Sequence, residues 1–175
     1  PGRRAIAGVD DSKKLDAATR VVLAARICEQ ALVVSLGAAS AREIDRINIY
    51  HATVLAMRRA LDRVPSRLGC APHHVLIDGK PLRTLGTVHT AVVKGDAKCY
   101  AIACASIVAK VERDRMLVEM HARYPQYGFA THKGYGTPEH VEALRAHGPC
   151  AEHRDLFVRT ILAGDPPPPE ATDGE

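Results

Sequence analysis

Apolar positions along the chain fall into long periodic stretches, which are typical of helices, and short unbroken runs, which are typical of buried strands. Residues 17–30 follow Asp16, a favourable N-cap, and predict a helix. From residue 48 to residue 64 apolar side chains recur every three or four positions, which predicts another helix. Ser40 and Glu43 have the spacing of a capping box, so a short helical turn is expected before it.

The short apolar runs predict three buried strands, at residues 31–40, 73–78 and 88–93. A long helix is expected over residues 97–123. Its first half, residues 101–109, is apolar on every side, which predicts burial. Thr137 and Pro138 then begin a last helix, which stops near Gly148.

Loops are expected at residues 65–72 and 124–136. Because strands and helices alternate, the predicted fold class is α/β, with a sheet flanked by helices. No stretch approaches the ~20 apolar residues of a membrane span, so no membrane partner is expected. Five cysteines without a C-x-x-C pair do not suggest a disulfide framework, and reduced thiols in a cytoplasmic protein are expected. No Cys/His group has the spacing of a zinc site.

Charge is unevenly distributed. The chain of 175 residues has a net charge of +4, but its last eleven residues, DPPPPEATDGE, contain four acids and no base. Residues 1–164 therefore hold 24 basic and 16 acidic side chains, a surplus that suits a polyanionic partner. We expect one domain over residues 1–164 and a disordered acidic, proline-rich tail over residues 165–175.

Two acids follow predicted strands: Asp78 ends one, and Asp96 follows the next in the segment KGD. In α/β sheets chemistry usually lies at strand ends, where two carboxylates can converge on a hard cation such as Mg²⁺. Such an ion can activate water in phosphodiester cleavage. The alternative is that Asp78 caps a turn and Asp96 caps the next helix, and the spacing leaves both open.

The segment HKGYGT offers Lys133 for a phosphate and Tyr135 as a flat surface for a base or sugar. The same residues are equally compatible with a simple turn before a capped helix. Ser106 and Lys110 lie one helical turn apart, and either emerge at a site or serve only the helix itself.

Together these segments resemble bacterial ribonuclease HII, the type 2 ribonuclease H family. The resemblance covers about residues 6–157. Six segments occur in family order: DSKKL, EIDRINIYHATVLAMRRA, VLIDG, VVKGDAKCYAIACASIVAKVERDRM, YPQYGFATHKGYGTPEH and LRAHGPCAEHR.

The resemblance implies a ribonuclease H-like fold with a central mixed sheet and a helical C-terminal part. It implies an endonuclease that serves DNA replication and repair. Such an enzyme cuts the RNA strand of RNA–DNA hybrids, and duplex DNA at embedded ribonucleotides, leaving 3′-hydroxyl and 5′-phosphate ends. The family uses Mg²⁺ or Mn²⁺ on four carboxylates and is expected to be monomeric. Asp78 and Asp96 match the third and fourth carboxylates. Tyr135 matches the tyrosine that packs against the deoxyribose at the RNA–DNA junction, and the expected phosphate contacts are Ser12, Lys13, Lys14, Ser106 and Lys133.

The first family motif, G-V/I-D-E-A-G-R-G, is matched only by its first three residues in GVDDSKKL, which instead fits the second motif. Asp10 and Asp11 are therefore expected to shape the loop that presents Lys13 and Lys14. An N-terminally truncated enzyme is expected, with its first strand missing, unpaired backbone, an apolar gap and weak metal binding. The alternatives are a non-catalytic nucleic-acid-binding remnant of this fold and a different nuclease that uses Asp10 and Asp11.

Overall fold

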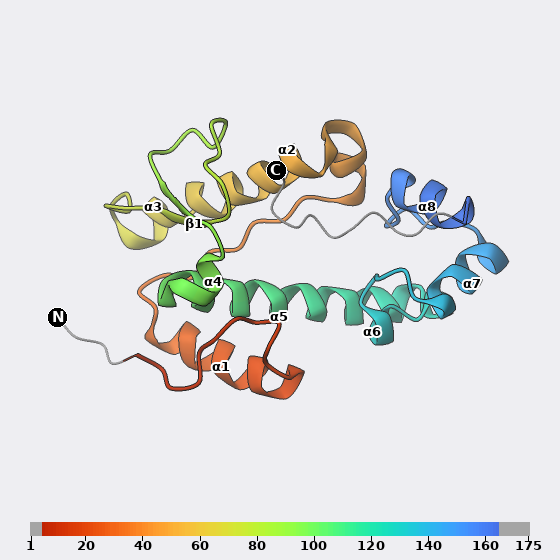
Figure 1. Ribbon diagram of the computed structural model, residues 1–175, viewed down its shortest axis with the longest axis horizontal. Coiled ribbons are helices and arrows are strands. Elements are labelled where there is room, and N and C mark those ends of the chain that lie inside the picture. Colours follow the sequence, from red (N-terminus) through yellow and green to blue (C-terminus); the bar gives the residue numbers. More distant parts are fainter. Residues whose placement is uncertain (1–4, 165–175) are drawn as a thin grey trace. The chain divides into compact units, whose positions relative to one another are not determined.

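The first helices form where the capping residues predict them. In the computed structural model, which describes residues 5–164, α1 spans Ala17–Gln30 (Figure 1). The Asp16 carboxylate accepts the backbone N–H of Thr19 at 2.8 Å, which satisfies one of the free donors at the helix start. Helix α2 spans Ala41–Asp62, with a kink at Asn48, whose φ is 65°. The capping box is confirmed, because the backbone N–H of Ser40 donates to Glu43 at 2.9 Å.

The remaining elements follow in chain order. They are α3 (Val64–Leu68), β1 (Leu76–Asp78), β2 (Thr90–Val92), α4 (Gly95–Lys98), α5 (Tyr100–Arg123), the 3₁₀-helix η1 (Pro125–Tyr127), α6 (Phe129–His132), α7 (Pro138–His147) and α8 (Asp155–Leu162). The chain divides into two compact units. Among the described residues, the first unit comprises residues 5–38 and 54–112, and the second comprises residues 39–53 and 113–164. The predicted tail, residues 165–175, lies outside the described residues.

The sheet is smaller than predicted. Strands β1 and β2 pair in parallel, with Leu76 opposite Thr90 and Asp78 opposite Val92. Within residues 5–164 they form a two-stranded sheet and pair with no third strand, so the mixed sheet is not seen there. Helix α4 follows β2 at once and contacts both strands. This arrangement places the two predicted acids at one edge of the sheet.

The strand predicted at residues 31–40 does not form. Its alternate carbonyls accept hydrogen bonds from three arginines spaced four residues apart, on α2, at the N-cap of α3 and on α3, instead of from a neighbouring strand. The pairs are Ala38 with Arg59 at 2.7 Å, Leu36 with Arg63 at 2.9 Å, and Val34 with Arg67 at 2.9 Å. A strand needs a partner, and in the described residues these side chains provide the donors.

Three other expectations need correction. The loop predicted at residues 65–72 begins within α3, because a proline is well suited to a first helical turn. The helix predicted over residues 97–123 is interrupted at Cys99, whose φ of −128° separates α4 from α5. The loop predicted at residues 124–136 contains the two short helices η1 and α6.

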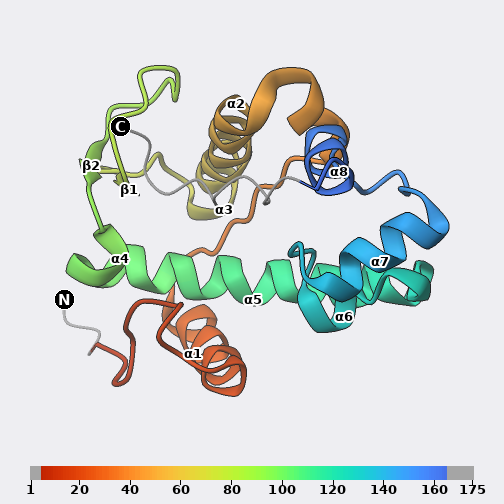
Figure 2. The same cartoon turned by 45° about the vertical axis from the view of Figure 1, so that its right-hand side comes forward.

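Helix α5 is not buried on all sides over residues 101–109. Ile107 and Val108 are buried and pack with Leu23 and Ile27 of α1, which lies alongside the first half of α5 (Figures 1 and 2). The alanines at positions 101, 105 and 109, one turn apart, are exposed instead. The described core covers only one face of this part of the helix.

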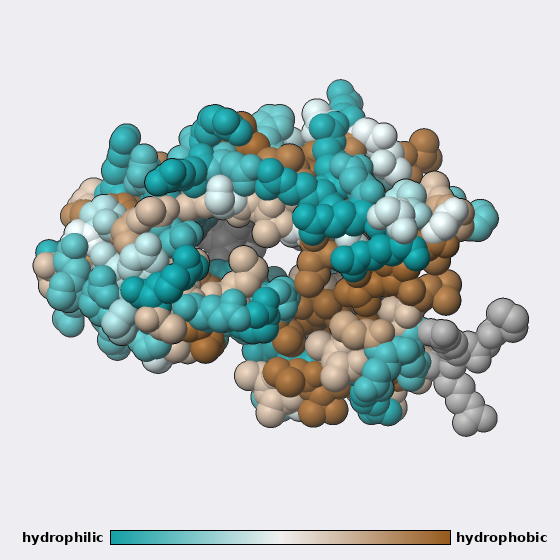
Figure 3. All heavy atoms as spheres, turned by 180° about the vertical axis from the view of Figure 1, so that it is seen from behind, coloured by the Kyte–Doolittle hydropathy of each residue, from teal (hydrophilic) through white to brown (hydrophobic). Residues whose placement is uncertain are grey.

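Each unit has its own core. In the first unit a second cluster forms around Ile77 of β1 and Val54 of α2, and in the second unit a cluster forms around Phe129 and Leu144. Hydrophobic side chains also remain exposed, as the brown surface in Figure 3 illustrates. At the small sheet Leu76 is 38% exposed and Val93 47% exposed. Among residues 5–164 no helix has the length and apolar character to cross a membrane.

Candidate metal centre and nucleic-acid contacts

In the first unit the structure places Asp78 against the backbone of Gly95, the residue that precedes Asp96. The carboxylate oxygen Oδ1 of Asp78, at the end of β1, accepts the backbone N–H of Gly95 at 2.6 Å. Asp96 is the next residue, and its Oδ1 accepts the N–H of Ala97 at 2.9 Å. Asp78 is exposed and Asp96 half-buried, so both can be reached from solvent.

Gly95 lets the Asp78 carboxylate lie close to the backbone at the start of α4. A Cβ added at this position would lie 2.7 Å from Cδ1 of Ile102 and 3.1 Å from Oδ1 of Asp78. Both distances are shorter than ordinary carbon contacts, so a larger residue would push the Asp78 carboxylate or Ile102 aside. The glycine of KGD therefore allows the close contact between the Asp78 carboxylate and the backbone next to Asp96.

The donor chemistry suits a hard divalent ion, because carboxylate oxygens are the ligands that Mg²⁺ and Mn²⁺ prefer. The number of donors is small. Within residues 5–164 no three or more His, Cys, Asp or Glu side chains gather as a metal site would require. Asp78 and Asp96 are thus the type of ligand that such an ion prefers, and they supply two of them.

The loop at Asp10 and Asp11 has the predicted internal structure. Asp10 accepts the N–H of Asp11 at 2.7 Å and the Lys14 ammonium at 3.2 Å, while Asp11 accepts the N–H of Lys13 at 2.9 Å. The backbone hydrogen bond from Asp11, and then the side-chain hydrogen bond from the Lys14 ammonium, lower the pKa of Asp10. The prediction that these acids shape the lysine loop is confirmed.

Ser12 and Ser106 are joined in the first unit, with 2.9 Å between their hydroxyl oxygens. Ser12 is only 6% exposed, and its carbonyl accepts the Arg20 guanidinium at 3.0 Å. Lys13 and Lys14 on the same loop are exposed. The loop is thus fixed from beneath, and its two lysines face solvent.

Lys133 and Tyr135 lie in the second unit, in the loop between α6 and α7. Tyr135 is 41% exposed, and the Arg113 guanidinium lies 5.3 Å from the centre of its ring. Lys133 has a left-handed backbone with φ of 50°, and its ammonium donates to the carbonyl of Ala130. The loop is therefore held in a specific conformation.

The sequence reasoning missed a group of buried histidines that supports this loop. His132, His140 and His153 are each at most 8% exposed. The ring centres of His132 and His140 stack 4.2 Å apart, and Nε2 of His140 lies 3.0 Å from Nε2 of His153. All three occur in the segments YPQYGFATHKGYGTPEH and LRAHGPCAEHR, but their spacing along the sequence gives no sign that they meet in the fold.

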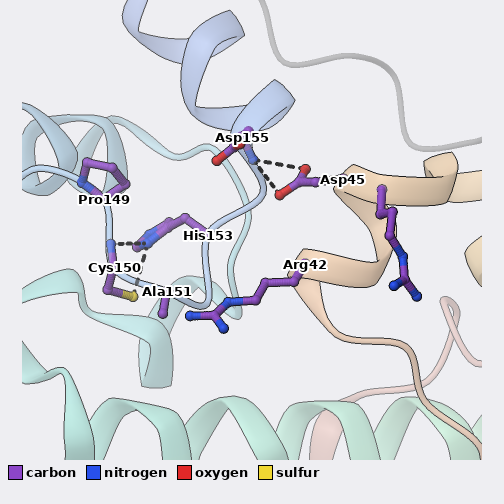
Figure 4. Close-up of a pocket in the computed structure, with 8 residues that line it drawn as sticks. Arg42, Asp45, Pro149, Cys150, Ala151, His153 and Asp155 are labelled. Carbon is purple, nitrogen blue, oxygen red and sulfur yellow. Dashed lines mark hydrogen bonds between the residues drawn. The ribbon is translucent and has the colours of Figure 1, made fainter.

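Figure 4 shows the surroundings of His153 at a pocket of the second unit. Nδ1 of His153 accepts the backbone N–H of Cys150 at 3.0 Å, and the Cys150 sulfur lies 3.1 Å from the same nitrogen. Arg42 and Asp45 of α2 line the same pocket. Asp45 accepts the N–H of Asp155 at 3.0 Å, which caps α8.

Burial lowers the pKa of His140 to about 4, and it lowers the pKa of His153 as well. The nearby His132 lowers both further, whereas Glu152 opposes the shift at His153. Between pH 6.5 and about 4 the unfolded state therefore binds more protons than the folded state at His140. The contribution of neutral His140 to the free energy of unfolding is therefore complete above pH 6.5. It is lost as the pH falls from 6.5 to about 4.

We expect the free energy of unfolding to fall by about 1 to 3 kcal/mol between pH 7 and pH 4.5 because of His140. Urea unfolding at pH 7, 5.5 and 4.5 measures this change. A variant with the non-titrating substitution His140→Gln should be less stable at pH 7 but lose less stability on acidification. An unchanged pH dependence in that variant would contradict the assignment to His140.

Comparison with known proteins places these features in context. The family model described as ribonuclease HII matches residues 5–162. The chain is 50% identical over 161 residues to the ribonuclease HII of Polynucleobacter asymbioticus, covering 91% of this chain and 82% of that protein. It is 53% identical over 153 residues to that of Polaromonas sp., covering 87% and 75%. It is 53% identical over 152 residues to that of Shewanella amazonensis, covering 87% and 72%.

Proposed function

Because the chain belongs to the ribonuclease HII family, we propose that it cleaves the RNA strand of RNA–DNA hybrids and incises duplex DNA at embedded ribonucleotides. The products carry 3′-hydroxyl and 5′-phosphate ends. The observation that carries this proposal is the pair Asp78 and Asp96 at the edge of the parallel strands, inside a family match over residues 5–162. By the same resemblance, the protein acts as a monomer in the cytoplasm.

Asp78 and Asp96 are the residues that hold Mg²⁺ or Mn²⁺ in this proposal. When bound, such an ion supplies activation of water and neutralisation of charge on the scissile phosphate. The Gly95 N–H fixes the orientation of the Asp78 carboxylate. The N–H of Ala97 does the same for Asp96. Each acid keeps a second carboxylate oxygen with which to bind a cation.

Two loops with basic side chains, one with Lys13 and Lys14 and one with Lys133, bind the duplex in this proposal. Lys13 and Lys14 bind backbone phosphates as point charges, on a loop fixed by the Ser12–Ser106 pair. In the proposal Ser12 and Ser106 also contact the backbone phosphates. In the second unit Lys133 binds a phosphate, and the exposed ring of Tyr135 packs on a sugar at the RNA–DNA junction.

The number of carboxylates gathered at this site within residues 5–164 bears on its affinity for the metal ion. Two carboxylates bind a divalent ion more weakly than four, since affinity rises with ligand charge and number. The exposed Leu76 and Val93 beside β1 and β2 also fit a sheet that gains stability from a further strand. A specific observation thus favours a second candidate function, salt-sensitive duplex binding without cleavage.

We expect a form with an added upstream strand that contains G-V-D-E-A-G-R-G, here called the extended form, to nick faster than the 175-residue chain. The expected gain is at least about a hundredfold, because the added strand supplies an Asp-Glu pair as further metal ligands. The substrate is a duplex with one ribonucleotide in Mg²⁺. Equal rates would contradict the argument from carboxylate number. Binding without nicking by both forms would favour the second candidate.

A further inference from the structure

We propose that His140 and His153 are positioning residues that set the backbone of Tyr135 through a buried chain of hydrogen bonds. This inference rests on the proposed function, since it assigns a role within the Tyr135 contact. This series of hydrogen bonds begins at Cys150 and ends on the Tyr135 carbonyl, which accepts Nδ1–H of His140 at 2.8 Å. All of its members lie in the second unit.

The direction of each hydrogen bond in this series follows from which atoms can donate. The backbone N–H of Cys150 can only donate, so Nδ1 of His153 is an acceptor. A neutral imidazole then carries its proton on Nε2, and that N–H donates to Nε2 of His140 across 3.0 Å. His140 therefore holds its own proton on Nδ1, which is the nitrogen that faces the Tyr135 carbonyl. One tautomer of each ring satisfies every contact, with both rings neutral.

The loop needs such support because its backbone is strained. Lys133 and Gly134 both have left-handed φ values, 50° and 80°, and a lysine seldom adopts that conformation. His132 holds the first half of the turn, since its Nδ1 accepts the N–H of Gly134 at 3.1 Å and its carbonyl accepts the N–H of Tyr135 at 3.0 Å. His140 holds the second half, and it stacks on His132.

The burial of these rings favours a positioning role over simple packing. His140 is 1% exposed and sits among aromatic side chains, including Phe129 and Phe157, where an apolar residue would pack without a desolvation cost. The polar ring gains a fixed hydrogen bond to the Tyr135 carbonyl, which also accepts the backbone N–H of Thr137 at 2.9 Å. In this proposal, loss of the His140 bond lets that carbonyl shift, and the shift changes the position of the Tyr135 ring that packs on the sugar.

The test separates the two nitrogens of His140. In His140→Asn the amide replaces Nδ1 and keeps a donor for the Tyr135 carbonyl, whereas in His140→Gln it replaces Nε2 and loses that donor. Both variants lose one buried hydrogen bond, so both should melt at a lower temperature. Only His140→Gln should weaken binding of a duplex with one ribonucleotide, by about five- to tenfold. His140→Asn should stay within about twofold. Equal binding by the two variants would overturn the proposal.

A double-mutant cycle with Tyr135→Ala links the effect to the tyrosine. The loss of about five- to tenfold from His140→Gln should disappear when Tyr135 is already alanine, and its persistence there would overturn the proposal. His147→Gln, on the exposed side of the same helix, is the matched control and should bind as the unaltered chain does. If Tyr135→Ala itself leaves binding unchanged, the proposed function of Tyr135 fails, which is a different result from an uncoupled His140.

Discussion

The substitution Asp78→Asn in the extended form is expected to lower the rate of nicking in Mg²⁺ by at least about a hundredfold. Asparagine keeps the shape of the side chain and an oxygen that can accept the Gly95 N–H, so the fold around β1 should persist. It removes the negative charge that a divalent ion needs as a ligand. Single-turnover cleavage of a duplex with one ribonucleotide measures the loss.

The control for this prediction is the double substitution Asp10→Asn and Asp11→Asn. These acids accept hydrogen bonds that hold the loop of Lys13 and Lys14 in place. Their replacement should therefore weaken duplex binding without removing the metal-dependent step. Full nicking activity with Asn at position 78 would show that the site is misassigned. Loss of nicking only in the loop variant would support a different nuclease that uses Asp10 and Asp11.

The substitution Gly37→Ala is expected to give the largest loss of stability. A Cβ at this position would lie 2.0 Å from the carbonyl oxygen of Ala56 and 2.8 Å from the nitrogen of Ala60, both of them backbone atoms of α2. Because the backbone of a helix cannot move as a side-chain end can, residues 31–40 would have to lift away from α2. That movement would also break the arginine bonds to their carbonyls, so we expect a loss of about 3 kcal/mol or more.

Urea unfolding at pH 7 measures this loss, with Gly69→Ala as the matched control. Gly69 has φ of 82°, and a Cβ added there would meet no atom within 4 Å. Its alanine variant therefore bears only the cost of a left-handed backbone, about 1 kcal/mol. Equal losses at the two positions would mean that residues 31–40 do not pack on α2 as closely as the structure shows.

The sequence predicted those parts of the fold whose causes are local. Helices α1 and α7 begin at Asp16 and Thr137 because a single side chain satisfies a backbone donor within three residues. The acids Asp78 and Asp96 were found because each follows a run of strand-forming residues. Both kinds of signal can be read from a short window of the chain.

The sequence could not show features that depend on distant partners. Residues 31–40 have the composition of a strand, but strand formation requires a neighbour, and arginines from α2 and α3 bind their carbonyls instead. The histidine chain was missed for the same reason. Each histidine looks ordinary in the sequence, and only the fold brings His140 within 3.0 Å of His153.

The central claim is that Asp78 and Asp96 act together on one divalent ion, and Mn²⁺ binding measured by electron paramagnetic resonance tests it most directly. The measurement compares the extended form with its Asp78→Asn, Asp96→Asn and doubly substituted variants. The account predicts that each single substitution weakens Mn²⁺ binding at least about tenfold, and that the double substitution adds little, because one shared site is already lost. Mn²⁺ binding that survives both single substitutions unchanged would contradict it.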